Sequence, residues 1–199
     1  MDALFTQWEP IINKHKESPN IEIEFRFGRK ASSGFDTNVG LAPFQKLLRS
    51  LDKYTGWETK NHESSTVYYF EGNKRVCINE ETDEQVGQIK KRVQVNDFTL
   101  EGHPFDVRLG ISTEEPFEYD GEETSTEQKT RERWSFVRKN LSIDLSKVKG
   151  NPDDPDCDDD TSYQVEMEIV EPEKVTTKNE LYNIAVSYTH LTLPTILRV

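Results

Sequence analysis

Two segments at opposite ends of the chain carry carboxylates at alternate positions. Glu22 and Glu24 alternate with apolar residues near the start, and Glu166 and Glu168 do so near the end. A period of two defines a β-strand, so each pair of carboxylates lies on one face of its strand. Like charges on facing strands repel each other unless a cation lies between them, and Mg²⁺ and Mn²⁺ prefer carboxylate oxygens. The two segments therefore predict a site for a hard divalent cation.

A basic segment in the middle of the chain complements these acidic pairs. Lys129, Arg131 and Arg133 occupy alternate positions, so the three cations share one strand face. Further cations lie in other predicted strands: Arg75, Lys91 and Arg108. If the sheet closes, inward cations face the four glutamates. A metal ion with a ring of Lys and Arg suits a triphosphate, because the metal polarises phosphoryl oxygens and the cations offset their charge.

The rest of the chain predicts the elements that hold these residues. Apolar residues recur at helical spacing in two segments, 2–17 and 42–54. The predicted strands are 21–29, 66–70, 74–78, 85–95, 105–112, 131–139, 142–148 and 162–171. Two acidic stretches rich in turn formers, 114–127 and 151–160, predict exposed loops. Many strands with two helices indicate a mainly β (α+β) chain folded as an antiparallel barrel or a curled sheet.

The composition fits one globular domain. The chain has 199 residues, of which 33% are hydrophobic and 10% aromatic, and its formal net charge is −12. This acidic balance disfavours non-specific binding to nucleic acids or membrane surfaces but leaves room for a local basic site. Cys77 and Cys157 lack the spacing of a disulfide framework or a zinc site, so we expect a reducing, intracellular location. We find no signal peptide and no apolar run of the ~18 residues that span a membrane.

The order of the charged strands resembles that of a known family, the triphosphate tunnel metalloenzymes. The segments that carry the resemblance are 21–28, 105–112, 131–136, 143–146 and 165–169. They are most similar to the RNA triphosphatase branch, which catalyses the first step of mRNA capping in fungi, protists and large DNA viruses. The resemblance covers about residues 20–172. It implies an eight-stranded antiparallel tunnel with flanking helices and charged side chains pointing inward.

The resemblance also implies an activity and a role for each site residue. Such enzymes hydrolyse the γ-phosphate of 5′-triphosphate RNA, and often of free NTPs, with Mn²⁺ or Mg²⁺. The implied metal ligands are Glu22, Glu24, Glu166 and Glu168, and the implied phosphate ligands are Arg75, Lys91, Arg108, Arg131 and Arg133, with Lys129 as an additional candidate. Asp144 and Ser146 would support the site. Gln164 and Ser142 depart from the family pattern, which often has an acidic and a basic residue there, and Glu171 could partly substitute for the missing acid.

Three other functions are compatible with the sequence. A related tunnel enzyme could act on tripolyphosphate or thiamine triphosphate, or cyclise a nucleotide. A non-catalytic module could bind polyphosphate or RNA ends, although four carboxylates are unfavourable for a pure anion binder. A plain acidic β-domain for protein contacts would instead expose its charged strand faces to solvent.

The sequence of the last residues predicts where the native domain ends. The codons of a transposon adapter used in sequencing libraries, read in frame, would encode the ten residues Val186–Thr195. We therefore expect a tunnel domain over 1–185 and a non-native tail over 186–199. The domain would then continue into unknown sequence, where a fused or associated guanylyltransferase is an expected partner. The expected location is the nucleus, or the cytoplasmic virus factory or virion of a large DNA virus.

Overall fold

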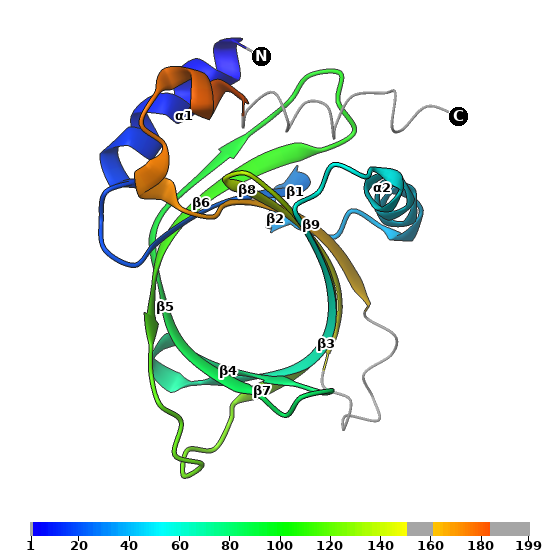
Figure 1. Ribbon diagram of the computed structural model, residues 1–199, viewed down its shortest axis with the longest axis vertical. Coiled ribbons are helices and arrows are strands. Elements are labelled where there is room, and N and C mark those ends of the chain that lie inside the picture. Colours follow the sequence, from blue (N-terminus) through cyan, green and yellow to red (C-terminus); the bar gives the residue numbers. More distant parts are fainter. Residues whose placement is uncertain (1, 151–160, 184–199) are drawn as a thin grey trace.

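Eight antiparallel strands close into a barrel that is open along its axis (Figure 1). The computed structural model describes residues 2–150 and 161–183. Around the barrel the strands are β1 (Ile21–Ala31), β6 (Asp106–Pro116), β5 (Gln85–Phe98), β4 (Lys74–Asn79), β3 (Thr59–Phe70), β7 (Glu127–Arg138), β8 (Leu141–Lys149) and β9 (Ser162–Ile169). Pairing of β9 with β1 closes the ring. The predicted eight-stranded tunnel is confirmed.

The short strand β2 (Gly34–Asp36) extends β1 beyond the ring as a hairpin. Gly28 makes this hairpin possible, because a Cβ atom there would collide with the Asp36 carbonyl oxygen and the Phe35 ring. The connection between β3 and β4 is a single 3-10 turn, Glu71–Asn73, as the hairpin pattern predicts.

The hydrophobic core lies outside the barrel, between its wall and the helices. In β1 the apolar positions Ile23 and Phe25 are fully buried against this outer core, while the alternate glutamates face the barrel interior. The Trp8 ring of helix α1 (Asp2–His15) lies 4.7 Å from the Phe25 ring, measured between centroids. A strand with one apolar and one charged face thus puts its charged face inside, because helices cover the apolar face.

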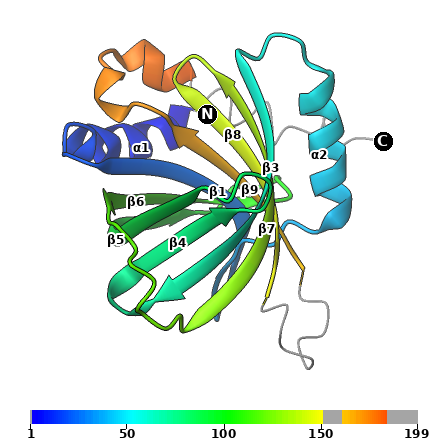
Figure 2. The same ribbon diagram turned by 60° about the horizontal axis from the view of Figure 1, so that its bottom comes forward.

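Both predicted helices are present, and each buries the face that its sequence periodicity indicates. Phe5, Trp8 and Ile12 of α1 are buried. Helix α2 (Leu41–Lys53) buries Phe44, Leu47 and Leu51 against the opposite side of the barrel (Figure 2). A second 3-10 turn, Pro172–Lys174, and helical residues 178–183 complete the described chain beside α1 (Figure 1).

Several predicted strand boundaries are wrong. Strand β7, for example, begins at Glu127 instead of residue 131, and two other errors concern polar segments. Strand β3 begins at Thr59 instead of residue 66, because the polar segment 59–65 has no apolar alternation and pairs with β7 nonetheless. Strand β6 continues to Pro116, so Glu114 belongs to a strand and not to an exposed loop. The predicted loop 151–160 and the predicted tail 186–199 lie outside the described residues.

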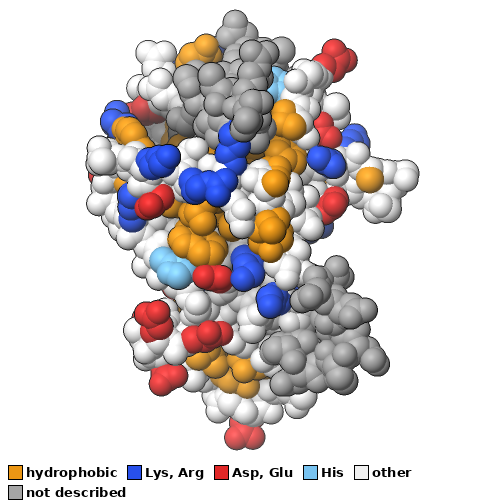
Figure 3. Space-filling view, turned by 90° about the vertical axis from the view of Figure 1, so that its right-hand side faces the viewer, with side chains coloured by type: hydrophobic (Ala, Val, Ile, Leu, Met, Phe, Trp, Pro, Cys, Tyr) orange, Lys and Arg blue, Asp and Glu red, His pale blue; other side chains and the backbone are white. Residues whose placement is uncertain are grey.

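The outer surface differs from the tunnel interior. On the face that carries α2, Lys and Arg side chains stand among hydrophobic ones in the upper half of the view, and Asp and Glu gather lower down (Figure 3). The charged faces of β1, β7 and β9 point inward instead, which contradicts the reading of a plain acidic domain with exposed charged strands. Within the described residues, no helix is long and apolar enough to cross a membrane.

Candidate active site

The barrel encloses a polar cavity of ≈ 580 Å³. All eight strands of the ring contribute to its lining, since inward positions recur at every second residue. Nine of the predicted site residues and supporting residues line it: Glu22, Glu24, Arg75, Lys129, Arg131, Arg133, Ser146, Glu166 and Glu168.

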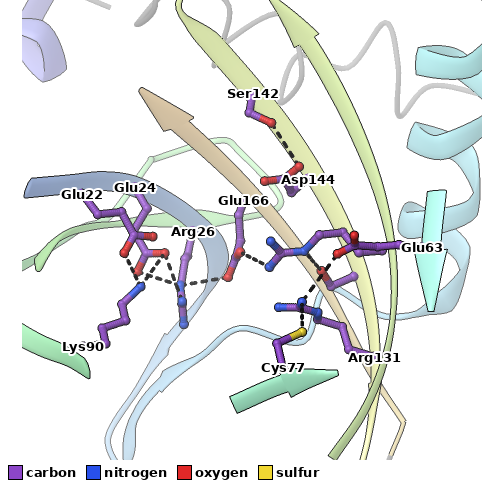
Figure 4. Close-up of polar contacts among 12 residues, drawn as sticks. Glu22, Glu24, Arg26, Glu63, Cys77, Lys90, Arg131, Ser142, Asp144 and Glu166 are labelled. Atoms are coloured by element: carbon purple, nitrogen blue, oxygen red, sulfur yellow. Dashed lines mark hydrogen bonds and ion pairs between the residues drawn. The ribbon is translucent and has the colours of Figure 1, made fainter. Parts of the chain in front are cut away.

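The acidic wall, which we define as Glu22, Glu24, Glu114, Glu166 and Glu168, belongs to β1, β6 and β9. Pairing of β1 with β9 sets Glu24 opposite Glu168 and Arg26 opposite Glu166. The Arg26 Nε lies 3.0 Å from a carboxylate oxygen of Glu24 and 3.0 Å from one of Glu166. Arg26 therefore joins the two acidic strands at the centre of the tunnel (Figure 4).

A second cation, Lys90 of β5, forms ion pairs with carboxylates of the acidic wall. Its Nζ lies 2.5 Å from a Glu22 oxygen, 3.1 Å from Glu114 and 3.8 Å from Glu24. Ser112 adds a hydroxyl donor to Glu22 at 3.1 Å. Gly110 leaves space for the Glu24 carboxylate, because a Cβ atom at position 110 would lie 3.0 Å from the Glu24 Oε1 atom.

Crowding of like charges perturbs the acidic wall. Burial, and then the charges of Glu22, Asp144 and Glu114, raise the pKa of Glu168 to about 8. Burial and the charge of Glu166 likewise raise the pKa of Glu24. The wall thus holds more negative charge than its cations balance.

The pKa values of Glu22 and Glu114 shift in opposite directions. Burial opposes ionisation of Glu22, but a hydrogen bond with Glu114 and the charge of Lys90 outweigh it and lower the pKa of Glu22 to about 2. The pKa of Glu114 moves the other way, raised by burial and by Glu22. Opposite pKa shifts are typical of two close carboxyl groups, because the charge of one disfavours ionisation of the other.

The donor set of the acidic wall fits a hard divalent cation. Among residues 2–150 and 161–183, no three Asp, Glu, His or Cys side chains converge as a ready-made metal cluster, and Arg26 and Lys90 lie between the carboxylates. The side chains nevertheless offer only oxygen donors, as Mg²⁺ and Mn²⁺ prefer. A cation would also relieve the repulsion that raises the pKa values of Glu24 and Glu168.

The basic wall, which we define as Arg75, Lys129, Arg131 and Arg133, belongs to β4 and β7. Arg133 donates to the Ser146 hydroxyl at 3.2 Å and lies 3.6 Å from a Glu166 oxygen, so it links the two walls. Arg131 lies 3.6 Å from Glu63 of β3.

The other two cations of the basic wall also have partners. Lys129 pairs with Glu127 at 2.9 Å, and Arg75 with Glu114 at 2.6 Å. Arg75 also donates to the Gln88 side chain. Positive charge therefore extends from Arg75 along β7 and faces the carboxylates across the cavity.

Asp144 lies directly opposite Glu166 in the pairing of β8 with β9, beside the acidic wall. It is 5% exposed and accepts a hydrogen bond of 3.1 Å from the Ser142 hydroxyl (Figure 4). Its charge raises the pKa values of Arg133 and Glu168, although other causes are larger for both. Glu171 lies beyond the end of β9, where it pairs with Lys174 on the surface, and so does not replace the missing acid at Gln164.

The placement predicted for Lys91 is wrong. Its side chain is 56% exposed on the outside of the barrel, 4.0 Å from Glu115, and Lys90 occupies the inward position. A β-bulge between Arg92 and Gln94 shifts the register of β5, and the run of three cations at 90–92 has no apolar alternation that would fix its face.

Arg108 faces inward but lies apart from the main cavity. It pairs with Asp97 at 2.7 Å, and its guanidinium carbon stands 4.7 Å from the centroid of the Phe35 ring. It lines an adjoining cavity of ≈ 760 Å³, which Arg92 and Lys74 also line.

Sequence reasoning missed several inward residues. The set comprises Arg26, Glu63, Ser65, Gln88, Lys90 and Glu114. Two of them carried a usable signal: Arg26 continues the alternation of Glu22 and Glu24, and Glu114 continues that of Arg108, Gly110 and Ser112. The others lie in segments where both faces are polar.

Comparison with known proteins agrees with this geometry. The model of the family described as mRNA capping enzyme, beta chain, the mRNA triphosphatases, matches residues 59–185. The chain belongs to this family. As a family member it is a hydrolase of the RNA triphosphatase class, and the resemblance stated from the charged strands is confirmed. No curated protein sequence matches the chain.

Solved structures share the fold of this triphosphatase family member. The Pct1 RNA triphosphatase of S. pombe is 16% identical, with a TM-score of 0.81 over 96% of this chain and 92% of that one. The mimivirus capping enzyme triphosphatase is 14% identical, with a TM-score of 0.64 over 96% of this chain and 97% of that one. At these identities the likeness concerns the fold.

Proposed function

We propose that this chain hydrolyses the γ-phosphate of 5′-triphosphate RNA, and of free NTPs, in a divalent-metal-dependent reaction that begins mRNA capping. The observation that carries this proposal is the pairing of an acidic wall with a basic wall inside one closed tunnel. Membership of the mRNA triphosphatase family supports it. An open cavity with cations on one side can hold the phosphates, and carboxylates on the other can hold a metal.

The residues of the two walls have different roles in this reaction. Arg75, Arg131 and Arg133 bind and orient the phosphate chain and offset charge on its non-bridging oxygens. Glu24, Glu166 and Glu168, with Glu22, would hold Mn²⁺ or Mg²⁺. When bound, such a metal supplies polarisation of the γ-phosphoryl group.

Arg26 and Lys90 act within the acidic wall. They keep the carboxylates in position, and they fix the spacing between β1, β5 and β9 by ion pairs of 2.5–3.8 Å. The side chains in these contacts are only 12–32% exposed, which strengthens the contacts relative to those in bulk solvent. Asp144, opposite Glu166 on the neighbouring strand, adds negative charge that raises the pKa values of Arg133 and Glu168.

The same proposal covers partner and location. The mimivirus neighbour is described as the RNA triphosphatase domain of a trifunctional mRNA capping enzyme. This supports a working association, by fusion or by contact, with a guanylyltransferase in the nucleus or in a viral factory. A longer read of the gene beyond residue 185 tests it, because a guanylyltransferase requires a lysine nucleophile motif downstream.

The decisive experiment is release of phosphate from γ-labelled 5′-triphosphate RNA with Mn²⁺ or Mg²⁺. The native chain should release phosphate only with metal, and Glu24→Ala and Glu168→Ala should each abolish release. Full activity of either variant would refute the acidic wall as the metal site. Parallel assays with NTP and tripolyphosphate separate an RNA triphosphatase from a tripolyphosphatase or thiamine triphosphatase, and metal-independent binding without turnover would indicate a non-catalytic module.

A further inference from the structure

A free thiol faces the tunnel on the side of the basic wall. Cys77 of β4 lines the main cavity and is partly exposed to it. Its sulfur accepts a hydrogen bond of 3.2 Å from the Arg131 Nη2 group (Figure 4). The thiol therefore touches a residue to which we assign phosphate binding, and its own role in that reaction is undefined.

Unsatisfied donors next to Cys77 indicate that a ligand binds there. The Ser65 side chain is 1% exposed, lines the same cavity and has no hydrogen-bond partner for its hydroxyl. Ser65 stands directly opposite Arg131 in the pairing of β3 with β7, and the buried Arg131 Nε also lacks a partner. Buried polar groups without partners call for an explanation, and two donors side by side fit an anionic ligand.

We propose that Cys77 is a modification site of the tunnel that forms mixed disulfides with small anionic disulfides, and that the adduct excludes the triphosphate. The exclusion rests on the proposed function, whereas the reaction of the thiol does not. The Cys77 thiolate attacks one sulfur of the disulfide, a new sulfur–sulfur bond forms, the original one breaks, and the other half leaves as a thiolate that takes up a proton. The small disulfide is the oxidant, and a dithiol reverses the step.

Charge selects the reagent. Arg131 contacts the sulfur, and Arg75 and Lys129 line the same cavity, so an anionic disulfide concentrates where the thiol lies. Displacement of a phosphate ligand explains the loss of function. A group attached to the Cys77 sulfur would take the place of the Arg131 guanidinium that contacts this sulfur, and Arg131 is one of the residues to which we assign phosphate binding.

The test uses the full chain and a pair of disulfide reagents. 5,5′-Dithiobis(2-nitrobenzoate) is anionic and 2,2′-dithiodipyridine is neutral, and each rate is divided by its rate with free glutathione. We expect an adduct at Cys77, identified by peptide mass spectrometry, and a faster normalised rate at this residue for the anionic reagent. Tripolyphosphate at ten times its dissociation constant should slow the labelling about tenfold by mass action.

Two cysteine variants complete the test. Cys157→Ser should keep the labelling of Cys77 and the loss of phosphate release that follows it. Cys77→Ser should lose both, with each protein's phosphate release compared only with its own untreated state. Labelling of Cys77 that tripolyphosphate does not slow, or a modified chain that still turns over RNA, would overturn the proposal. A chain that shows protected labelling but never hydrolyses RNA would overturn the proposed function and leave this site standing.

Discussion

The acidic and basic walls of the tunnel face each other, but their charges are satisfied differently. In the acidic wall, Arg26 and Lys90 hold Glu22, Glu24 and Glu166 at 2.5–3.8 Å. Burial and the remaining carboxylates of this wall still raise the pKa of Glu168.

Each cation of the basic wall lies 2.6–3.6 Å from one carboxylate. The Arg131 guanidinium lies 3.6 Å from a Glu63 carboxylate oxygen and donates a hydrogen bond to the Cys77 sulfur. Its buried Nε has no hydrogen-bond partner. The acidic wall can therefore accept a cation on the side of β1 and β9. The basic wall can accept an anion on the side of β7. This difference supports the proposal that the tunnel binds a metal ion and a triphosphate together.

The largest effect should come from removing one charge of the acidic wall without changing its shape. We expect Glu24→Gln to lower phosphate release by about 10²–10³-fold, because metal polarisation and charge placement are lost together. Glu115→Gln is the matched control, since Glu115 lies outside the barrel and is 49% exposed. Equal activities of the two variants would refute the role of the acidic wall in the reaction.

The register of β5 gives the next effect. Lys90→Met removes an inward cation and should lower turnover about 10–100-fold. Lys91→Met removes its outward neighbour, whose exposed pairing with Glu115 contributes little, and should stay within about twofold of the native rate. Steady-state assays at saturating Mn²⁺ measure both, and a larger loss in the Lys91 variant would refute the observed register.

A smaller effect is expected from Gly110→Ala. The new Cβ atom would lie 3.0 Å from the Glu24 Oε1 atom, so the carboxylate must shift by a few tenths of an ångström. We expect turnover to fall about tenfold, because a small displacement in a positioned site is costly. The midpoint of thermal unfolding should change little, and a loss of stability without a loss of turnover would argue against the role of Gly110.

The smallest effect is a change in stability with pH. The pKa of Glu168 is about 8 in the folded chain and 4.5 ordinarily, so the folded state holds a proton that the unfolded chain has released. Stability from this group falls as pH rises from about 4.5 to 8. Glu168→Gln should therefore raise the free energy of unfolding at pH 7 by about 1–3 kcal/mol without metal, and leave it unchanged at pH 4.

Urea unfolding at the two pH values measures this difference. Added Mn²⁺ should stabilise the native chain at pH 7 and stabilise Glu168→Gln much less, since the variant lacks one carboxylate of the metal site. A variant that is less stable than the native chain at pH 7 would show that Glu168 is not crowded by its neighbours.

Residues in strands with clear alternation were predictable, and those in polar strands were not. Glu22 and Glu166 lie beside fully apolar positions, so their face followed from the sequence, and both line the tunnel. Lys90 and Lys91 stand in a run of cations interrupted by a bulge, so only pairing with β6 decides which one points inward. Glu114 was assigned to a loop because its neighbours are acidic, although β6 carries it into the cavity.

The sequence by itself determined which residue types face which side of the strands, because the side-chain period of two is a local property of the backbone. It also determined the family, through the order of the charged strands. Only the tertiary structure decided which charges meet. Closure of β9 on β1 sets Glu24 opposite Glu168 and Arg26 opposite Glu166, and these contacts depend on the register of strands far apart in the chain. A shift of one residue would turn every such side chain to the other face.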